Sequence, residues 1–201
     1  MIMEHQHIQY LQVKKLLLQM KILQIRSGFE DNGPGSQSLT IATELRNRGH
    51  YVEFAASDCV MINQIEKSEF IFNKLDSLSR NKRNIFTFIQ SIILLRKLIK
   101  NKSIDIVHAH NAASAITSFI ACILLRKKIK VFHSVRGIEL RPELRYRWRN
   151  WIYRFYPMHI FAVSQFTKNE LIALGVNKDN ITVTYNGVDL KKFNLANADK
   201  N

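Results

Sequence analysis

The sequence has few residues of the types that interrupt regular structure. Its 201 residues include only seven glycines and three prolines. This low content leaves little room for disordered linkers or for a β-rich fold. With 46% hydrophobic residues, a chain of this length can bury one large core, so we expect a single domain.

Cysteines and long apolar runs are also scarce. The two cysteines, Cys59 and Cys122, lie in apolar segments and form neither a CxxC motif nor a Cys/His metal-ligand spacing. This pattern predicts buried thiols in a reducing compartment. No stretch reaches the roughly 18 uncharged apolar residues of a spanning helix. The N-terminus lacks the small-residue cleavage site of a signal peptide.

Acidic residues are rare in the middle of the chain. Residues 74–154 hold 18 Lys and Arg against four acids, a net charge of +14, while the rest of the chain is neutral overall. This concentration favours an anionic partner: lipid headgroups, a phosphorylated acceptor or nucleic acid. Nucleic acid is the weakest of the three, because no helix-turn-helix, zinc or RNP motif accompanies the charge. A solvated basic surface without a partner is the alternative.

Short apolar segments alternate with helical periodicity from residue 20 onward. Strands are expected at residues 20–25, 51–55, 104–109, 129–134, 159–163 and 181–185, and helices at 36–48, 84–100, 112–126, 141–156 and 167–174. The alternation predicts an α/β fold, a doubly wound, mainly parallel Rossmann-like sheet with helices on both faces. We expect an N-terminal extension at 1–19, the domain at 20–195 and a tail at 196–201.

Two of the expected helices, at 84–100 and 141–156, combine apolar or aromatic residues with Arg and Lys. This composition fits a core stripe with a solvated basic face. It fits equally an interfacial helix that anchors the protein on a membrane.

The first polar motif follows the first strand and opens a helix. In an open parallel sheet, ligands bind beyond the carboxyl ends of the strands. The motif is Asn32-Gly33-Pro34-Gly35-Ser36. Glycines let backbone N–H groups approach a phosphate, and a helix N-terminus favours an anion. The motif is not GxGxxG, which disfavours a dinucleotide, and a plain turn with a helix cap is the alternative.

The second motif, His108-Ala109-His110-Asn111, ends the strand at 104–109. Alternation along a strand directs both histidines to the same face, with one of them at the strand tip. Histidines of the core or surface without a function are the alternative. A zinc site is disfavoured, because no third ligand is evident.

Further polar residues follow the later strands. Arg136, Gly137 and Glu139 come after the strand at 129–134, and the arginine suits a phosphate or an acidic acceptor. Ser164 precedes a helix and fits an N-cap without any further role.

The third motif, NGVD from Asn186 to Asp189, follows the last strand, where Asn-Gly also fits a simple turn. Taken in order, the three motifs resemble the N-terminal, acceptor-side half of a family 4 glycosyltransferase. That family has the GT-B architecture of two Rossmann-like domains. The resemblance covers roughly residues 20–195 and depends on the ordered set of motifs.

The resemblance implies roles for individual residues. His110 would be the catalytic residue beside the transferred sugar, with His108 in support. Gly33, Gly35 and Ser36 would face the donor phosphates. The cleft or acceptor surface would include Asn111, Arg136, Gly137, Glu139, Ser164, Asn186 and Asp189, although the family commonly has a histidine where this chain has Arg136.

The resemblance also implies a retaining transfer of a sugar from a nucleotide-diphosphate sugar, a co-substrate, to a surface-glycan or lipid-linked acceptor. Family members commonly work at the cytoplasmic face of a membrane, so we expect a peripheral location there. The half that carries the nucleotide-sugar site is not among these 201 residues. We therefore expect no transfer without a donor-binding domain, such as one on a separate polypeptide. The alternatives are a non-catalytic acceptor- or membrane-binding subunit and the remnant of a truncated gene.

Overall fold

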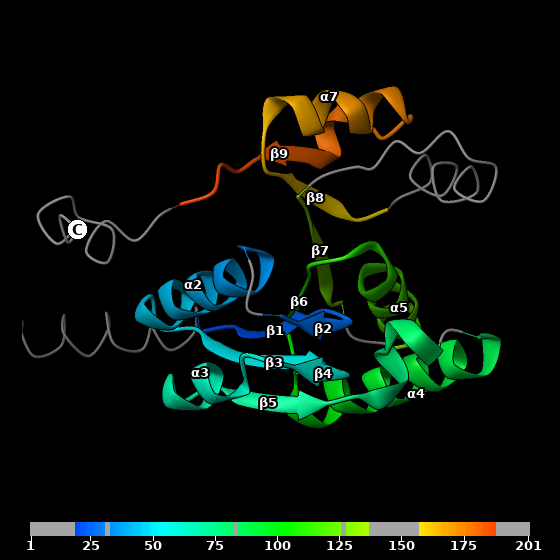
Figure 1. The fold of residues 1–201 in the computed structure, drawn as a ribbon. Helices are drawn as coiled ribbons and strands as arrows, with labels where there is room; N and C mark the ends of the chain where they lie inside the picture. The colour runs from blue at the N-terminus through cyan, green and yellow to red at the C-terminus, as the bar shows by residue number, and fades with distance from the viewer. Residues whose placement is uncertain (1–18, 31–32, 83, 126–127, 137–156, 188–201) are drawn as a thin grey trace, which may run out of the picture.

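A computed structural model describes residues 19–30, 33–82, 84–125, 128–136 and 157–187. Its centre is a seven-stranded sheet in which all neighbouring strands run parallel (Figure 1). In sheet order the strands are β5 (Ile71–Lys74), β3 (Tyr51–Ala56), β1 (Lys21–Ile25), β6 (Ile106–Ala109), β7 (Lys130–Val135), β8 (His159–Ala162) and β9 (Ile181–Val183). The predicted α/β, doubly wound parallel fold is confirmed.

Helices cover both faces of this sheet (Figure 1). One face packs against α2 (Gly33–Asn47) and α3 (Ile62–Lys67), and the other against α4 (Ile85–Lys102), α5 (Ala112–Ile123) and α7 (Gln165–Ala173). The other described elements are the 3-10 turns η1 (Asp76–Leu78), η2 (Arg80–Lys82) and η3 (Lys178–Asn180), and a small parallel pair, β2 (Gly28–Phe29) with β4 (Asp58–Cys59).

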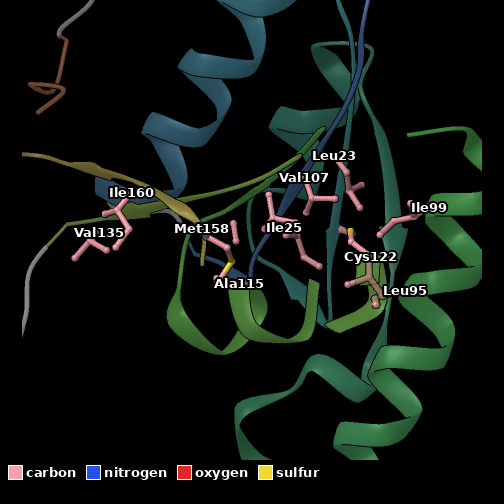
Figure 2. Packing of buried hydrophobic residues seen from close by; sticks show 14 of the residues in the cluster. Leu23, Ile25, Leu95, Ile99, Val107, Ala115, Cys122, Val135, Met158 and Ile160 are labelled. Atoms are coloured by element: carbon pink, nitrogen blue, oxygen red, sulfur yellow. The ribbon is translucent and has the colours of Figure 1, made fainter. Parts of the chain in front are cut away.

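Successive side chains of β1 enter different halves of the core. Leu23 and Ile25 are fully buried in the cluster that includes Ile99 of α4 (Figure 2). Ile22 belongs to the opposite cluster, with Ala42 of α2. Because side chains alternate across a strand, the polar residues at even positions of β1 and β6 lie on the α2 face.

Asparagine side chains fix the starts of α4 and α5. The Asn84 side chain accepts a hydrogen bond from Thr87 N at 2.9 Å, and Thr87 Oγ1 accepts one from Asn84 N at 3.0 Å, which completes a capping box. The Asn111 side chain accepts from Ser114 N at 2.9 Å. These local signals explain why both helices begin where the strand-end loops meet the sheet.

The chain reverses its winding direction between β1 and β6. After β1 it adds β3 and β5 on one side, then returns to β6 on the other. The two strand ends are joined, since His110 N donates to Ile25 O at 2.9 Å and Asn111 Nδ2 donates to Ser27 Oγ at 2.9 Å. Doubly wound folds bind ligands at such a switch point.

Some boundaries differ from those expected. Helix α2 begins at Gly33 instead of 36, because the missing N–H of Pro34 is tolerated in the first turn. Helix α5 ends at Ile123 instead of 126. The short edge strand β5 and helix α3 were not expected; β5 is only partly buried and lacks a long apolar run. The expected helix at 141–156, most of the extension at 1–19 and the tail at 196–201 lie outside the described residues.

Across the described parts of the chain, no helix combines the length and the apolar character needed to cross a bilayer.

Candidate functional site

A groove of about 410 Å³ lies between α2 and the neighbouring side of strands β6 to β9. One wall is a single face of α2 from Gln37 to Leu45, together with Arg48 just after the helix. The other wall comes from the strands and the segments that follow them, and it includes His108, Ser134, Arg136 and Thr184 to Gly187. The groove therefore gathers residues that are far apart in the sequence at the edge where strand ends meet.

The two histidines of the second motif lie together, as the alternation of β6 predicts. Their ring centroids are 4.4 Å apart. The His108 Nε2 atom is 2.8 Å from Ser134 Oγ, and His108 lines the groove. The His110 Nε2 atom hydrogen-bonds Gln24 Oε1 on β1, and only 5% of His110 is exposed. His110 thus lies beneath the groove wall, and it is not among the groove-lining residues.

Arg136 connects this pair to the start of α2. Its Nη2 atom is 3.3 Å from His110 Nδ1, and its Nη1 atom is 3.4 Å from the Gly33 carbonyl oxygen. Because Gln24 Oε1 can only accept, the His110 Nε2 atom carries the proton and Nδ1 is left to accept from the guanidinium. A chain of contacts therefore runs from β1 through β6 to α2.

The histidines of the site are held in the neutral form. Burial lowers the pKa of His108 to about 4, with the positive charge of Arg136 as the second cause. Burial also lowers the pKa of His110 well below its ordinary value, and His108 and Arg136 lower it further. Burial of Arg136, together with the charge of Arg26, lowers the pKa of its guanidinium to about 10. At neutral pH the site offers uncharged imidazoles beside cationic arginines.

Two polar residues at the end of β1 were missed by sequence reasoning. Gln24 is fully buried and its Nε2 atom has no hydrogen-bond partner among the described residues. Arg26 is 7% exposed, and its Nε and Nη1 atoms also lack partners there. The signal was present, because Gln24 interrupts the apolar run of β1 and Arg26 directly follows the strand.

The glycines of the first motif have different surroundings. A side chain at Gly33 would meet nothing within 4 Å, so this start of α2 is open. A Cβ atom at Gly35 would lie 2.0 Å from the Glu30 carbonyl oxygen and 2.6 Å from the Met61 sulfur. Gly35 is therefore explained by close packing of α2. Ser36 is exposed in the first turn of the helix.

The other predicted site residues divide between the groove and helix caps. Asn186 lines the groove. Asn111 caps α5, and Ser164 caps α7 by accepting from Thr167 N at 3.1 Å. Neither of these two caps is among the groove-lining residues. The predicted positions Gly137, Glu139 and Asp189 lie outside the described residues.

In the described part of the chain, no group of three or more His, Cys, Asp and Glu side chains has an arrangement that could hold a metal ion. Cys59 and Cys122 are free thiols there, and burial raises their pKa values to about 11 and about 12.

The parallel sheet, its switch point and the groove of strand-end residues define a Rossmann-like domain of the GT-B type. Solved structures share this fold over about half of their length. A glycosyltransferase from Rickettsia africae has a TM-score of 0.73 and 22% identity, and the match covers 91% of this chain and 47% of that one. Anabaena Alr3699/HepE, solved with UDP and glucose, has a TM-score of 0.66 and 20% identity, over 86% and 46% of the two chains.

The lipopolysaccharide outer core galactosyltransferase WaaB, in its apo form, has a TM-score of 0.63 and 19% identity, over 85% of this chain and 47% of that one. None of the curated proteins compared with the chain matches it. The model of Glycosyltransferase Family 4 matches residues 32–192. The chain therefore belongs to glycosyltransferase family 4, and it spans about half the length of the solved structures that it matches.

Proposed function

We propose that this domain is the acceptor-side half of a retaining glycosyltransferase. The reaction moves a sugar from a nucleotide-diphosphate sugar to a surface-glycan or lipid-linked acceptor. A donor-binding domain, in the same assembly, supplies the contacts to the nucleotide. The observation that carries the proposal is the family membership together with the groove that joins His108, Arg136 and Asn186 at the strand ends.

Two structural relatives support the two substrates separately. HepE was solved with UDP and glucose, which supports a nucleotide-diphosphate sugar as the donor. WaaB is named as a lipopolysaccharide galactosyltransferase, which supports a glycan as the acceptor.

The site suits a reaction in which charge develops on the leaving diphosphate. That diphosphate can accept the proton of the acceptor hydroxyl, so no protein nucleophile is required. The positive end of α2 at Gly33 and Ser36 faces the donor phosphates, and the Arg136 guanidinium adds a charged donor beside it. Fixed dipoles and charges of this kind stabilise the transition state without reorganising.

His110 has a supporting electrostatic role in this proposal, since its lowered pKa makes it a weak base. As a neutral imidazole it accepts a hydrogen bond from Arg136 and holds the guanidinium beside the start of α2, where the phosphates bind. His108 fixes the second wall of the groove through Ser134.

The test is transfer from radiolabelled UDP-sugars by the assembly that includes the donor domain. Substituting His110→Ala is expected to lower turnover far more than His159→Ala. His159 is a fair control, because it also sits on the sheet and hydrogen-bonds Thr182 at 2.8 Å, but outside the groove. Equal and small losses in both variants would remove His110 from the site. Circular dichroism of both variants separates lost chemistry from lost folding.

We also propose that the domain binds an anionic membrane surface, at the inner face, through α4. This helix exposes apolar residues along its first turns and basic residues farther on. The apolar set is Ile85, Phe86, Ile89 and Ile93, and the basic set is Arg96, Lys97 and Lys100. Apolar side chains beside cationic ones are typical of helices that lie in a membrane interface. A surface of this kind brings the groove to lipid-linked acceptors.

A further inference from the structure

A second cavity, of about 520 Å³, opens at the same edge of the sheet but on the opposite face. It lies between the starts of α4 and α5, which pack against each other on that face (Figure 1). We call it the α4–α5 pocket. Its volume falls within the ~300–1,000 Å³ of small-molecule sites.

The lining of the α4–α5 pocket carries no charged side chain. The N-terminal dipoles of the two helices are already partly occupied, because Asn84 caps Thr87 N and Asn111 caps Ser114 N. An anionic group would therefore find neither a cation nor these two amides. The polar part of the lining consists of hydroxyl groups and the amide of Asn84. This chemistry suits an uncharged ligand.

Two of those hydroxyl groups have no partner among the described residues. Ser114 is fully buried, yet its Oγ atom makes no hydrogen bond, and the Oγ atom of Ser77 is unpaired as well. Other hydroxyls of the lining are satisfied, since Ser91 donates to Ser77 O and Thr117 donates to Ala113 O. Both Oγ atoms are covered in the free protein. A ligand hydroxyl that displaces the atoms above them recovers the free energy that a buried hydroxyl without a partner costs.

The apolar part of the lining complements these hydroxyls. Phe88 contributes an aromatic ring, and Leu78 and Ile116 contribute aliphatic surface. A sugar ring presents hydroxyl groups at its edge and C–H groups on its face, so it satisfies both kinds of lining. A purely apolar chain would leave Ser77 and Ser114 unpaired.

The pocket and the groove lie on the two faces of the sheet beside the switch point. Ser27 lines the pocket, and its Oγ accepts from Asn111 Nδ2 at 2.9 Å. Asn111 directly follows His110, which lies beneath the groove wall. The ends of β1 and β6 therefore separate the two cavities.

We propose that the α4–α5 pocket binds a neutral sugar unit of the acceptor glycan. The inference deepens the proposed function, and it rests on that function for the assignment of the sugar to the acceptor. Ser114 and Ser77 hydrogen-bond the sugar hydroxyls, and Phe88 packs on the ring face. The sugar unit in the pocket is already part of the acceptor glycan, while the acceptor hydroxyl that reacts lies in the groove.

Saturation-transfer NMR tests the pocket with methyl glycosides of glucose, galactose and mannose as the probes, without any donor. At least one of them is expected to bind, and Ser114→Ala is expected to weaken its binding about tenfold, as the loss of one hydrogen bond predicts. Ser118→Ala is the matched control, since Ser118 is equally buried one turn along α5 and its Oγ donates to Ser114 O. It should leave binding unchanged.

Stability provides a second measurement. Ser114→Ala removes a hydroxyl that is unpaired in the free protein, so the urea midpoint should stay the same or rise. Ser118→Ala removes a hydrogen bond that is present in the free protein and should lower the urea midpoint. A second pocket variant, Ile116→Phe, fills the cavity and should abolish binding of the same glycoside.

Three results would overturn the proposal: no glycoside binds, binding survives Ser114→Ala and Ile116→Phe, or glucose 6-phosphate binds more tightly than methyl glucoside through Ser114. Failure of the proposed function has a different signature. In that case glycoside binding depends on Ser114, but the complete assembly transfers no sugar.

Discussion

The two hollows at one edge of this sheet have linings of opposite character. The groove on the α2 face contains buried titratable groups, with neutral His108 and His110 beside the cationic Arg136. The α4–α5 pocket, on the other face of the same strand ends, is lined only by uncharged side chains. The contrast arises because strands β6 and β7 supply His108 and Ser134 to the groove, whereas helices α4 and α5 and the loops beside them line the pocket.

The largest expected difference between the two hollows is their response to acid. The folded pKa of His108 is about 4, below the ordinary 6.5, so the folded state favours its neutral form. Above pH 6.5 both states are neutral and stability is flat. As the pH falls from 6.5 to 4, the unfolded state binds the proton first and the protein loses about 3 kcal/mol from this residue.

Urea unfolding of wild type and His108→Gln across this pH range measures the effect. The variant should lose less stability on acidification. If His108→Gln has the wild-type slope, His108 is not a source of the acid sensitivity. Glycoside binding in the pocket should not change over the upper part of this range.

The next difference concerns the first turns of α2, beside the groove, and of α5, beside the pocket. Gly35→Ala in α2 would place Cβ 2.0 Å from a backbone oxygen, which cannot move aside as a side-chain end can. We expect a loss of about 1–3 kcal/mol in the free energy of unfolding, measured with urea. Helix α5, by contrast, begins with two alanines and needs no glycine.

Gly33→Ala is the matched control in the same turn of α2. The open space around it predicts unchanged stability or a gain of up to about 1 kcal/mol. If Gly33→Ala costs as much as Gly35→Ala, the close approach of α2 to Glu30 is not the reason for the glycine.

The smallest expected effect per residue is the contribution of surface residues of α4 to membrane binding. Sedimentation with phosphatidylglycerol vesicles, but not with neutral ones, is expected at low salt and should weaken at high salt. Each basic residue near the surface contributes about 1 kcal/mol. Phe86→Ser should reduce binding, because this side chain is 80% exposed in the apolar first turn of the helix.

Phe166→Ser is the control for that measurement. Phe166 is 70% exposed on α7, so it has similar surface chemistry but lies on another helix. Equal losses for both phenylalanines, or equal binding to both vesicle types, would contradict docking through α4.

Sequence reasoning succeeded where the information is local. Alternation of strands and helices gave the fold class, and period-two alternation placed His108 and His110 on one face. The predicted cap at Ser164 acts within three residues, so its pattern is readable in the chain itself. The caps at Asn84 and Asn111 are equally local, but they were not predicted. Edge strand β5 escaped this reasoning, because an edge strand needs no continuous apolar run.

The sequence by itself therefore determined the parallel α/β architecture, the strand-end positions of the motifs and the family resemblance. Only the tertiary structure decided which of these residues meet: Gln24 with His110, Arg136 with Gly33, and Ser27 with Asn111. It also placed His110 below the groove wall and left Ser114 unpaired in the second pocket. These arrangements depend on contacts between residues about 30 to 100 positions apart in the sequence. No local sequence pattern encodes the burial that such contacts produce. Burial in turn decides whether a histidine is charged or neutral.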